Sequence, residues 1–187
     1  MTGERASGGR PRVVVTRPAH QAAELIAAFR AAGFPTELLP LLEVVPPADA
    51  QPLDQAVAGL GDFDWVALTS ANAVAPLADR LKGGWPHRTR LAAVGPATAR
   101  AAREAGLPVS VEAEQAQAEG LVAALGGTVA GRRVLLPQAA DARPALERGL
   151  AAAGARVTAA VAYDKRLPSD APPRARELFS REIGWVT

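Results

Sequence analysis

The sequence has 187 residues, a formal net charge of +2 and no cysteine, and this length permits one sizeable core or two smaller ones. Without cysteine the chain cannot form disulfides, thiolate metal sites or a cysteine nucleophile, and no apolar run approaches the roughly 20 residues that span a bilayer. The first ten residues are polar and glycine-rich, without the apolar stretch of an export signal. We therefore expect a disordered lead-in over residues 1–10 and a cytoplasmic protein.

Composition also argues against nucleic acid and metal. The sequence pI is 9.6, yet the arginines are scattered among acidic residues and aromatics make up only 4%, whereas a nucleic-acid footprint needs a clustered basic face with aromatics. The two histidines, His20 and His87, show no paired-ligand spacing. We expect no nucleic-acid partner, no membrane partner and no metal site.

The chain begins with a β-α-β pattern. Residues 12–16 form a short β-branched run, and residues 20–32 repeat apolar positions at helical spacing until a glycine ends the helix. Residues 37–45 read as a second strand, which Pro40 places at an edge or a bend. Pro46 and Pro47 then stiffen the chain as a linker does, so we expect a domain boundary there.

A second series of alternating strands and helices follows. Such alternation predicts a parallel, doubly wound α/β sheet with right-handed crossovers. The expected strands cover residues 65–68, 91–94, 109–111, 133–137 and 156–163, and the expected helices cover residues 53–60, 72–81, 99–105, 118–125 and 142–153.

The chain then passes a second proline-rich linker, residues 167–173, and enters a helix at residues 174–179. Its last four residues, 184–187, resemble the opening of a strand of the same type as residues 65–68. A strand with nothing after it is an odd end for an α/β protein, and we expect this chain to be an incomplete form of a longer one.

Hydroxyl and amide groups follow several of the expected strands. They are Thr16-Arg17, Thr69-Ser70, Thr98, Pro137-Gln138 and Tyr163. In an open parallel sheet, ligands bind at the carboxyl edge, and such groups hold an anion through many modest hydrogen bonds. Ser70 or Asn72 can cap the next helix, so Ser70 is alternatively only an N-cap. Arg17 and Arg143 can each clamp a carboxylate, or be solvated surface charges.

Two common site types are not supported. No G-x-x-x-x-G-K-[ST] or G-x-G-x-x-G pattern occurs, although the turn at Gly95 runs directly into a helix. Ser70 lies in no G-x-S-x-G elbow, so a hydrolytic triad is not indicated.

Several segments, taken in order and spacing over most of the chain, are similar to one enzyme family. They are residues 15–18 (VTRP), 39–42 (LPLL), 64–74 (DWVALTSANAV), 93–99 (AVGPATA), 135–150 and 154–163. Together they resemble uroporphyrinogen-III synthase.

The resemblance implies two flavodoxin-like lobes, with residues 11–45 plus 168–187 in lobe one and residues 48–164 in lobe two. It implies a cofactor-free lyase, a monomer when full length, that cyclises hydroxymethylbilane with loss of water and inverts the last pyrrole ring. Gln138 departs from a Pro-Arg-Gly type of turn in the family. A second Thr-Ser strand end is expected to start at Thr187, so lobe one is about half present.

On this view Tyr163 lies at a strand end facing the cleft, and its hydroxyl forms a hydrogen bond to the departing hydroxyl of the substrate. The alternative interpretation is that Tyr163 packs its ring at a domain edge with its hydroxyl in water. Thr98 donates to a substrate carboxylate or caps its helix. The competing class is a non-catalytic, small-anion-binding or regulatory module, or an inactive truncated relative. The expected substrate-binding residues are Arg17, Thr69, Ser70, Asn72, Gly95, Thr98, Gln138 and Arg143.

Overall fold

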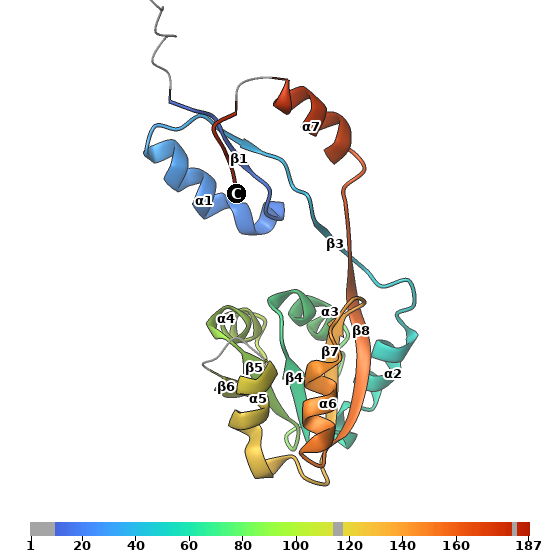
Figure 1. Ribbon diagram of the computed structural model, residues 1–187. Coiled ribbons are helices and arrows are strands. Elements are labelled where there is room, and N and C mark those ends of the chain that lie inside the picture. The colour runs from blue at the N-terminus through green and yellow to red at the C-terminus, as the bar shows by residue number, and fades with distance from the viewer. Residues whose placement is uncertain (1–9, 114–117, 181–182) are drawn as a thin grey trace, which may run out of the picture. The chain divides into compact units, whose positions relative to one another are not determined.

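The computed structural model describes residues 10–113, 118–180 and 183–187 and divides into two compact units (Figure 1). Unit 1 comprises the chain up to Val44 together with Lys165–Thr187, and unit 2 comprises Val45–Asp164. Nearly all of the expected lead-in lies outside the described residues. The assignment of lobes to residues 11–45 plus 168–187 and 48–164 stays a prediction.

Unit 1 contains, among the described residues, a three-stranded parallel sheet in the order β2-β1-β9. The strands are short, and the central β1 is a run of three valines that are buried on both faces, as expected for a parallel sheet between helices. In chain order the elements are β1 (Val13–Val15), α1 (Ala19–Ala31), β2 (Thr36–Leu38), α7 (Ala171–Phe179) and β9 (Trp185–Val186).

The alternation of side chains along β1 determines which helix each valine meets. Val13 and Val15 pack in one cluster with Ala22 of α1, and Phe29 of α1 lies against the same cluster. Val14 points to the other face and packs with Leu178 of α7. The two helices therefore cover opposite faces of this sheet.

Unit 2 is built on a larger sheet with the strand order β3-β8-β7-β4-β5-β6 in the described part of the chain. All of the pairings from β8 to β6 are parallel. The strands of this sheet are β3 (Glu43–Val45), β4 (Trp65–Leu68), β5 (Arg90–Val94), β6 (Val109–Ala113), β7 (Arg133–Ala139) and β8 (Arg156–Arg166). The first two residues of β3 and the last two of β8 belong to unit 1. Its α-helices are α2 (Gln51–Ala58), α3 (Val74–Ala78), α4 (Pro96–Glu104), α5 (Ala118–Leu125) and α6 (Ala145–Ala152).

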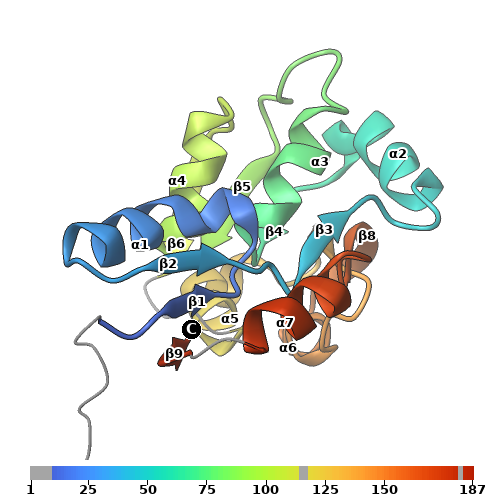
Figure 2. The ribbon, with the colours of Figure 1, turned by 90° about the horizontal axis from the view of Figure 1, so that it is seen from above.

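Helices cover both faces of this sheet. Trp65 and Ala67 of β4 share a buried cluster with Leu121 of α5 and Leu150 of α6. Successive strand residues point to opposite faces, so the buried Val66 and Leu68 point away from α5 and α6. Figure 2 shows α2, α3 and α4 on the other side of the sheet from α5 and α6. The expected parallel-dominated α/β arrangement is thus present in unit 2.

Several element boundaries differ from expectation, and three of the differences bear on the topology. The strand expected over residues 37–45 is two strands, because β2 ends at Leu38 and β3 begins at Glu43 in the other sheet, with Pro40 in the break. The helix expected over residues 72–81 is a 3₁₀ turn (Ala71–Ala73) followed by the short α3. The strand expected to end at Tyr163 continues to Arg166, because β8 pairs with β3. The chain passes between the units through these two strands.

No helix in the described ranges is both long enough and apolar enough to cross a bilayer.

Candidate functional site

The carboxyl ends of β7, β4 and β5 form one edge of the unit 2 sheet. These strands are adjacent and parallel, so the residues after each of them emerge on the same side. Ser70 follows β4, Gly95 follows β5, and Gln138 lies near the end of β7. The structure therefore brings these expected site residues to one edge.

Ser70 caps the turn that follows β4. Its backbone is extended, and its Oγ accepts a hydrogen bond from the Asn72 amide at 3.2 Å. The predicted capping role of Ser70 is confirmed, while Asn72 supplies a backbone donor rather than the cap. Thr69 is exposed just before the cap, and the turn contacts both α4 and β7. The hydrogen bond to the Asn72 amide fixes the Ser70 hydroxyl, and the turn Ala71–Ala73 that follows is held against two neighbouring elements.

Gly95 forms the second turn of the edge. Its φ of 76° lies in the left-handed region that favours glycine, and its amide donates to the Ala113 carbonyl at 3.0 Å. Gly95 is the N-cap of α4 and Pro96 the first helical residue, so the alternative in which Thr98 caps this helix is wrong. Thr98 instead lies buried in the first turn.

The start of α4 supplies backbone donors, of which Ala97 was not among the expected site residues and Thr98 was expected to act through its side chain. The first amides of a helix have no intrahelical acceptor, and the helix dipole favours an anion there. At α4 these amides include those of Ala97 and Thr98. Glycine at the N-cap followed by proline at the first position was the signal in the sequence that locates them.

Gln138 and Arg143 belong to the end of β7 and the loop beyond it. The strand continues to Ala139, so Gln138 is half-buried inside it and not beyond its end as expected. Arg143 is exposed and precedes α6, which begins at Ala145 rather than at residue 142. Arg143 is thus carried by a loop on the same side of the sheet as Ser70.

Tyr163 is buried, with 5% of its surface exposed, and it is not at the end of its strand. The expected strand end is wrong because β8 continues to Arg166, where it pairs with β3. The Tyr163 carbonyl nevertheless accepts a hydrogen bond from the Ala140 amide at 2.9 Å. Tyr163 therefore lies level with the carboxyl end of β7.

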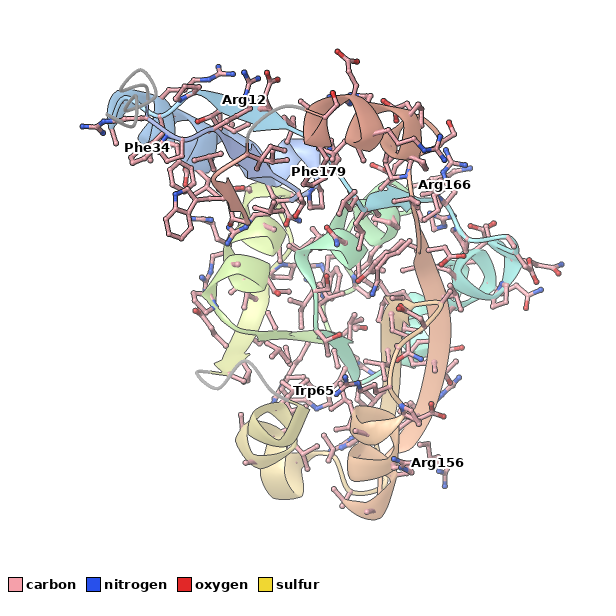
Figure 3. The ribbon with its side chains drawn as sticks, turned by 45° about the horizontal axis from the view of Figure 1, so that its top comes forward. Arg12, Phe34, Trp65, Arg156, Arg166 and Phe179 are labelled. Atoms are coloured by element: carbon pink, nitrogen blue, oxygen red, sulfur yellow. The ribbon has the colours of Figure 1, made fainter. Side chains whose placement is uncertain are left out.

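Arg17 belongs to unit 1, where it is exposed directly after β1. The same unit contains the ion pair between Arg166, labelled in Figure 3, and Glu43, with 2.9 Å between Nε and Oε2. Hydrogen bonding and charge attraction from Glu43 raise the pKa of the Arg166 guanidinium above its ordinary value. In the part of the chain that the structure describes, no group of three or more His, Cys, Asp or Glu residues is arranged to hold a metal ion.

The sequence is similar to known proteins over most of its length. A family model described as "Uroporphyrinogen-III synthase HemD" matches residues 23–187. A uroporphyrinogen-III synthase of Synechococcus elongatus is 36% identical over 168 residues, which are 87% of this chain and 64% of that protein. A putative uroporphyrinogen-III synthase of Methanothermobacter thermautotrophicus is 37% identical over 171 residues, covering 89% of this chain and 67% of that protein.

A solved structure gives the same fold. The crystal structure of a mutant uroporphyrinogen III synthase from Thermus thermophilus has a TM-score of 0.67 and 22% identity, covering 94% of this chain and 71% of that one. At this identity the likeness concerns the fold alone. The matched part of the chain spans 64% of the length of the Synechococcus protein and 67% of that of the Methanothermobacter protein.

Proposed function

The chain belongs to the uroporphyrinogen-III synthase family, and from this premise we propose that it cyclises hydroxymethylbilane to uroporphyrinogen III. The reaction is a cofactor-free loss of water in which the last pyrrole ring is inverted. The observation that carries the proposal is the family match over residues 23–187. We further propose that units 1 and 2 are two flavodoxin-like lobes of a cytoplasmic, monomeric enzyme.

The carboxylates of the substrate are the groups that the edge of unit 2 is suited to bind. The edge offers the hydroxyls of Thr69 and Ser70 after β4 and the first-turn amides of Ala97 and Thr98 after β5, and the turn Ala71–Ala73 contacts α4. Donors of this kind form charge-assisted hydrogen bonds to carboxylates. In this proposal Asn72, Gly95 and Gln138 shape the edge and Arg143 supplies positive charge there, while Arg17 is a proposed carboxylate-binding residue of unit 1.

Positioning supplies most of the proposed catalysis. Ring closure onto the substituted carbon of the last ring requires the flexible tetrapyrrole to be held in one folded conformation. Holding two reacting groups in place contributes about 7–11 kcal/mol, whereas one proton donor contributes about 10²–10⁴-fold. A set of modest donors on a rigid sheet edge suits such a reaction better than a strong acid or base would.

Tyr163 is the proposed proton donor. Its side chain is buried, and its backbone lies level with the end of β7. A phenolic O–H can donate a hydrogen bond to the departing hydroxyl. The carbon–oxygen bond of the hydroxymethyl group breaks, water leaves, and the freed carbon bonds to the substituted carbon of the last ring. For that ring to be inverted, its bond to the neighbouring methylene carbon must then break and re-form at its unsubstituted α carbon, which loses a proton.

The test is to incubate the chain with hydroxymethylbilane and separate the type I and type III products. Spontaneous closure gives type I, so the proposal predicts a type III fraction that rises with protein concentration. A heat-denatured sample is the control for spontaneous closure.

A product that is entirely type I at every protein concentration would contradict catalysis by this chain. If the chain still slowed spontaneous closure in that case, it would bind the substrate without converting it, as a non-catalytic anion-binding module does.

A further inference from the structure

A pocket of about 450 Å³ lies at the opposite edge of the unit 2 sheet from the candidate site. Asp64 and Trp65 stand where β4 begins, Arg90 where β5 begins, and Arg132 just before β7. Because these strands are parallel, their amino ends share one edge. The complete lining is Asp64, Trp65, Arg88, Arg90, Gly127, Thr128, Ala130 and Arg132.

Backbone pairing holds the charged residues of this pocket in place. Trp65, labelled in Figure 3, pairs with Arg90 on one side and with Val134 on the other. The Arg90 amide donates to the Asp64 carbonyl at 2.9 Å, and the Asp64 amide donates to the Arg133 carbonyl at 2.9 Å. Asp64, Trp65 and Arg90 are therefore fixed by the pairing of adjacent strands, while Arg88, Gly127, Thr128 and Ala130 come from the turns beside them.

The single carboxylate of the lining is already fully engaged. Asp64 Oδ1 accepts a hydrogen bond from Arg132 at 3.1 Å, and its Oδ2 accepts one from the Arg133 amide at 2.9 Å. Three arginines against one aspartate leave a formal charge of +2 on the lining.

The other two arginines have no carboxylate partner in the described part of the chain. The Arg90 guanidinium lies 5.5 Å from the centroid of the Trp65 ring, a contact that orients it without neutralising its charge. Arg88 is exposed at the pocket wall. Two guanidinium groups without a carboxylate partner therefore line this pocket, and planar guanidinium forks match oxyanions well.

We propose that this pocket binds a dianion of the phosphate class, either free phosphate or the phosphate of a small metabolite. Its volume falls within the range of about 300–1,000 Å³ that small ligands occupy. Space is available at the wall, since a Cβ at Gly127 would meet no atom within 4 Å. The lining suits a compact oxyanion better than a tetrapyrrole, because its single aromatic residue, Trp65, is only 4% exposed.

The test is isothermal titration of the chain with inorganic phosphate at low ionic strength, with sodium chloride as the ionic-strength control. We expect saturable binding to one site, and Arg88→Ala should weaken it by about tenfold, the value of one charge-assisted contact. Gly127→Asp should abolish it, because the added carboxylate enters open space in the pocket. Arg148→Ala, which removes an exposed arginine from α6 outside the lining, is the matched control and should leave binding unchanged.

Glycerol 3-phosphate in a second titration separates the two sources of the dianion. Tighter binding of the monoester supports a metabolite, and tighter binding of inorganic phosphate supports the free ion. Absence of saturable binding for both, or equal affinity of the parent chain and Arg88→Ala with circular dichroism unchanged, would overturn the proposal. The titration requires no catalytic turnover, so its outcome is independent of the proposed cyclisation.

Discussion

The carbonyl oxygen of Thr187 accepts two hydrogen bonds from Thr16, one from its amide at 2.7 Å and one from its Oγ1 at 2.9 Å. The Thr187 amide in turn donates to the Val14 carbonyl at 2.9 Å. These bonds continue the parallel pairing of β9 with β1 beyond the last strand residue. The prediction that the last residues open a strand is thereby confirmed, and Thr16 attaches that strand to the centre of its sheet.

Replacing Thr16 by valine should loosen β9 without unfolding the chain. Valine keeps the shape and the amide but loses the hydroxyl, whose hydrogen bond contributes about 0.5–1.5 kcal/mol. Amide hydrogen exchange should show protection at Thr187 reduced by up to about tenfold. Thr158→Val, at an exposed position of β8, serves as the matched control and should leave that protection unchanged.

Gly184 is predicted to tolerate no side chain. A Cβ at this position would lie inside van der Waals contact with the Cβ and Cγ of Pro11, and the Gly184 amide is fixed by a 3.0 Å hydrogen bond to the Arg12 carbonyl. Gly184→Ala should therefore destabilise unit 1 by about 1–3 kcal/mol, the usual cost of overpacking, as measured by urea denaturation. Gly83→Ala, where a Cβ meets nothing within 4 Å, should change stability by less than about 0.5 kcal/mol. Equal effects of the two substitutions would show that Pro11 moves away at little cost.

The local sequence pattern was sufficient to predict the elements that a short run or repeat of apolar residues defines. The strand Trp65–Leu68 and the helix Ala118–Leu125 have the predicted bounds, because a buried four-residue run and a helix ended by glycines are visible without knowledge of their neighbours. The cap at Ser70 was visible for the same reason, since the acceptor and its amide donor are two residues apart.

Errors arose where a distant partner determines the outcome. Residues 37–45 have one β-like composition, yet β2 pairs with β1 while β3 joins the sheet of β8. The pairing with β3 likewise carries β8 past Tyr163, which no property of residues 156–163 indicates. The arginine-lined pocket at the amino ends of β4, β5 and β7 combines residues from three strand ends and the turn after α5. Only the order of the strands in the sheet brings these residues together.

Ser70 is expected to contribute to stability through its cap. Ser70→Ala removes the acceptor of the Asn72 amide and should cost about 0.5–2 kcal/mol, whereas Ser70→Gly should cost only a few tenths of a kcal/mol. Urea denaturation of unit 2, followed by tryptophan fluorescence, measures both. Thr69→Ala, which changes the exposed neighbouring hydroxyl, should stay within about 0.5 kcal/mol of the parent. A loss for Thr69→Ala as large as that for Ser70→Ala would indicate that the hydroxyl of Thr69, and not the cap alone, supports this turn.

Tyr163→Phe tests how the proposed cyclisation divides between positioning and proton donation. Phenylalanine preserves the buried ring and removes only the hydroxyl, so the sheet should remain folded. If positioning dominates, type III formation should slow by roughly 10²-fold or less, with the substrate concentration for half-maximal rate little changed. The measurement compares product isomers and initial rates for the two proteins at matched circular dichroism. Complete loss of type III product with the fold intact would assign the larger part of the rate to proton donation by Tyr163, whereas an unchanged rate would remove Tyr163 from the chemistry and leave it a packed ring beside the end of β7.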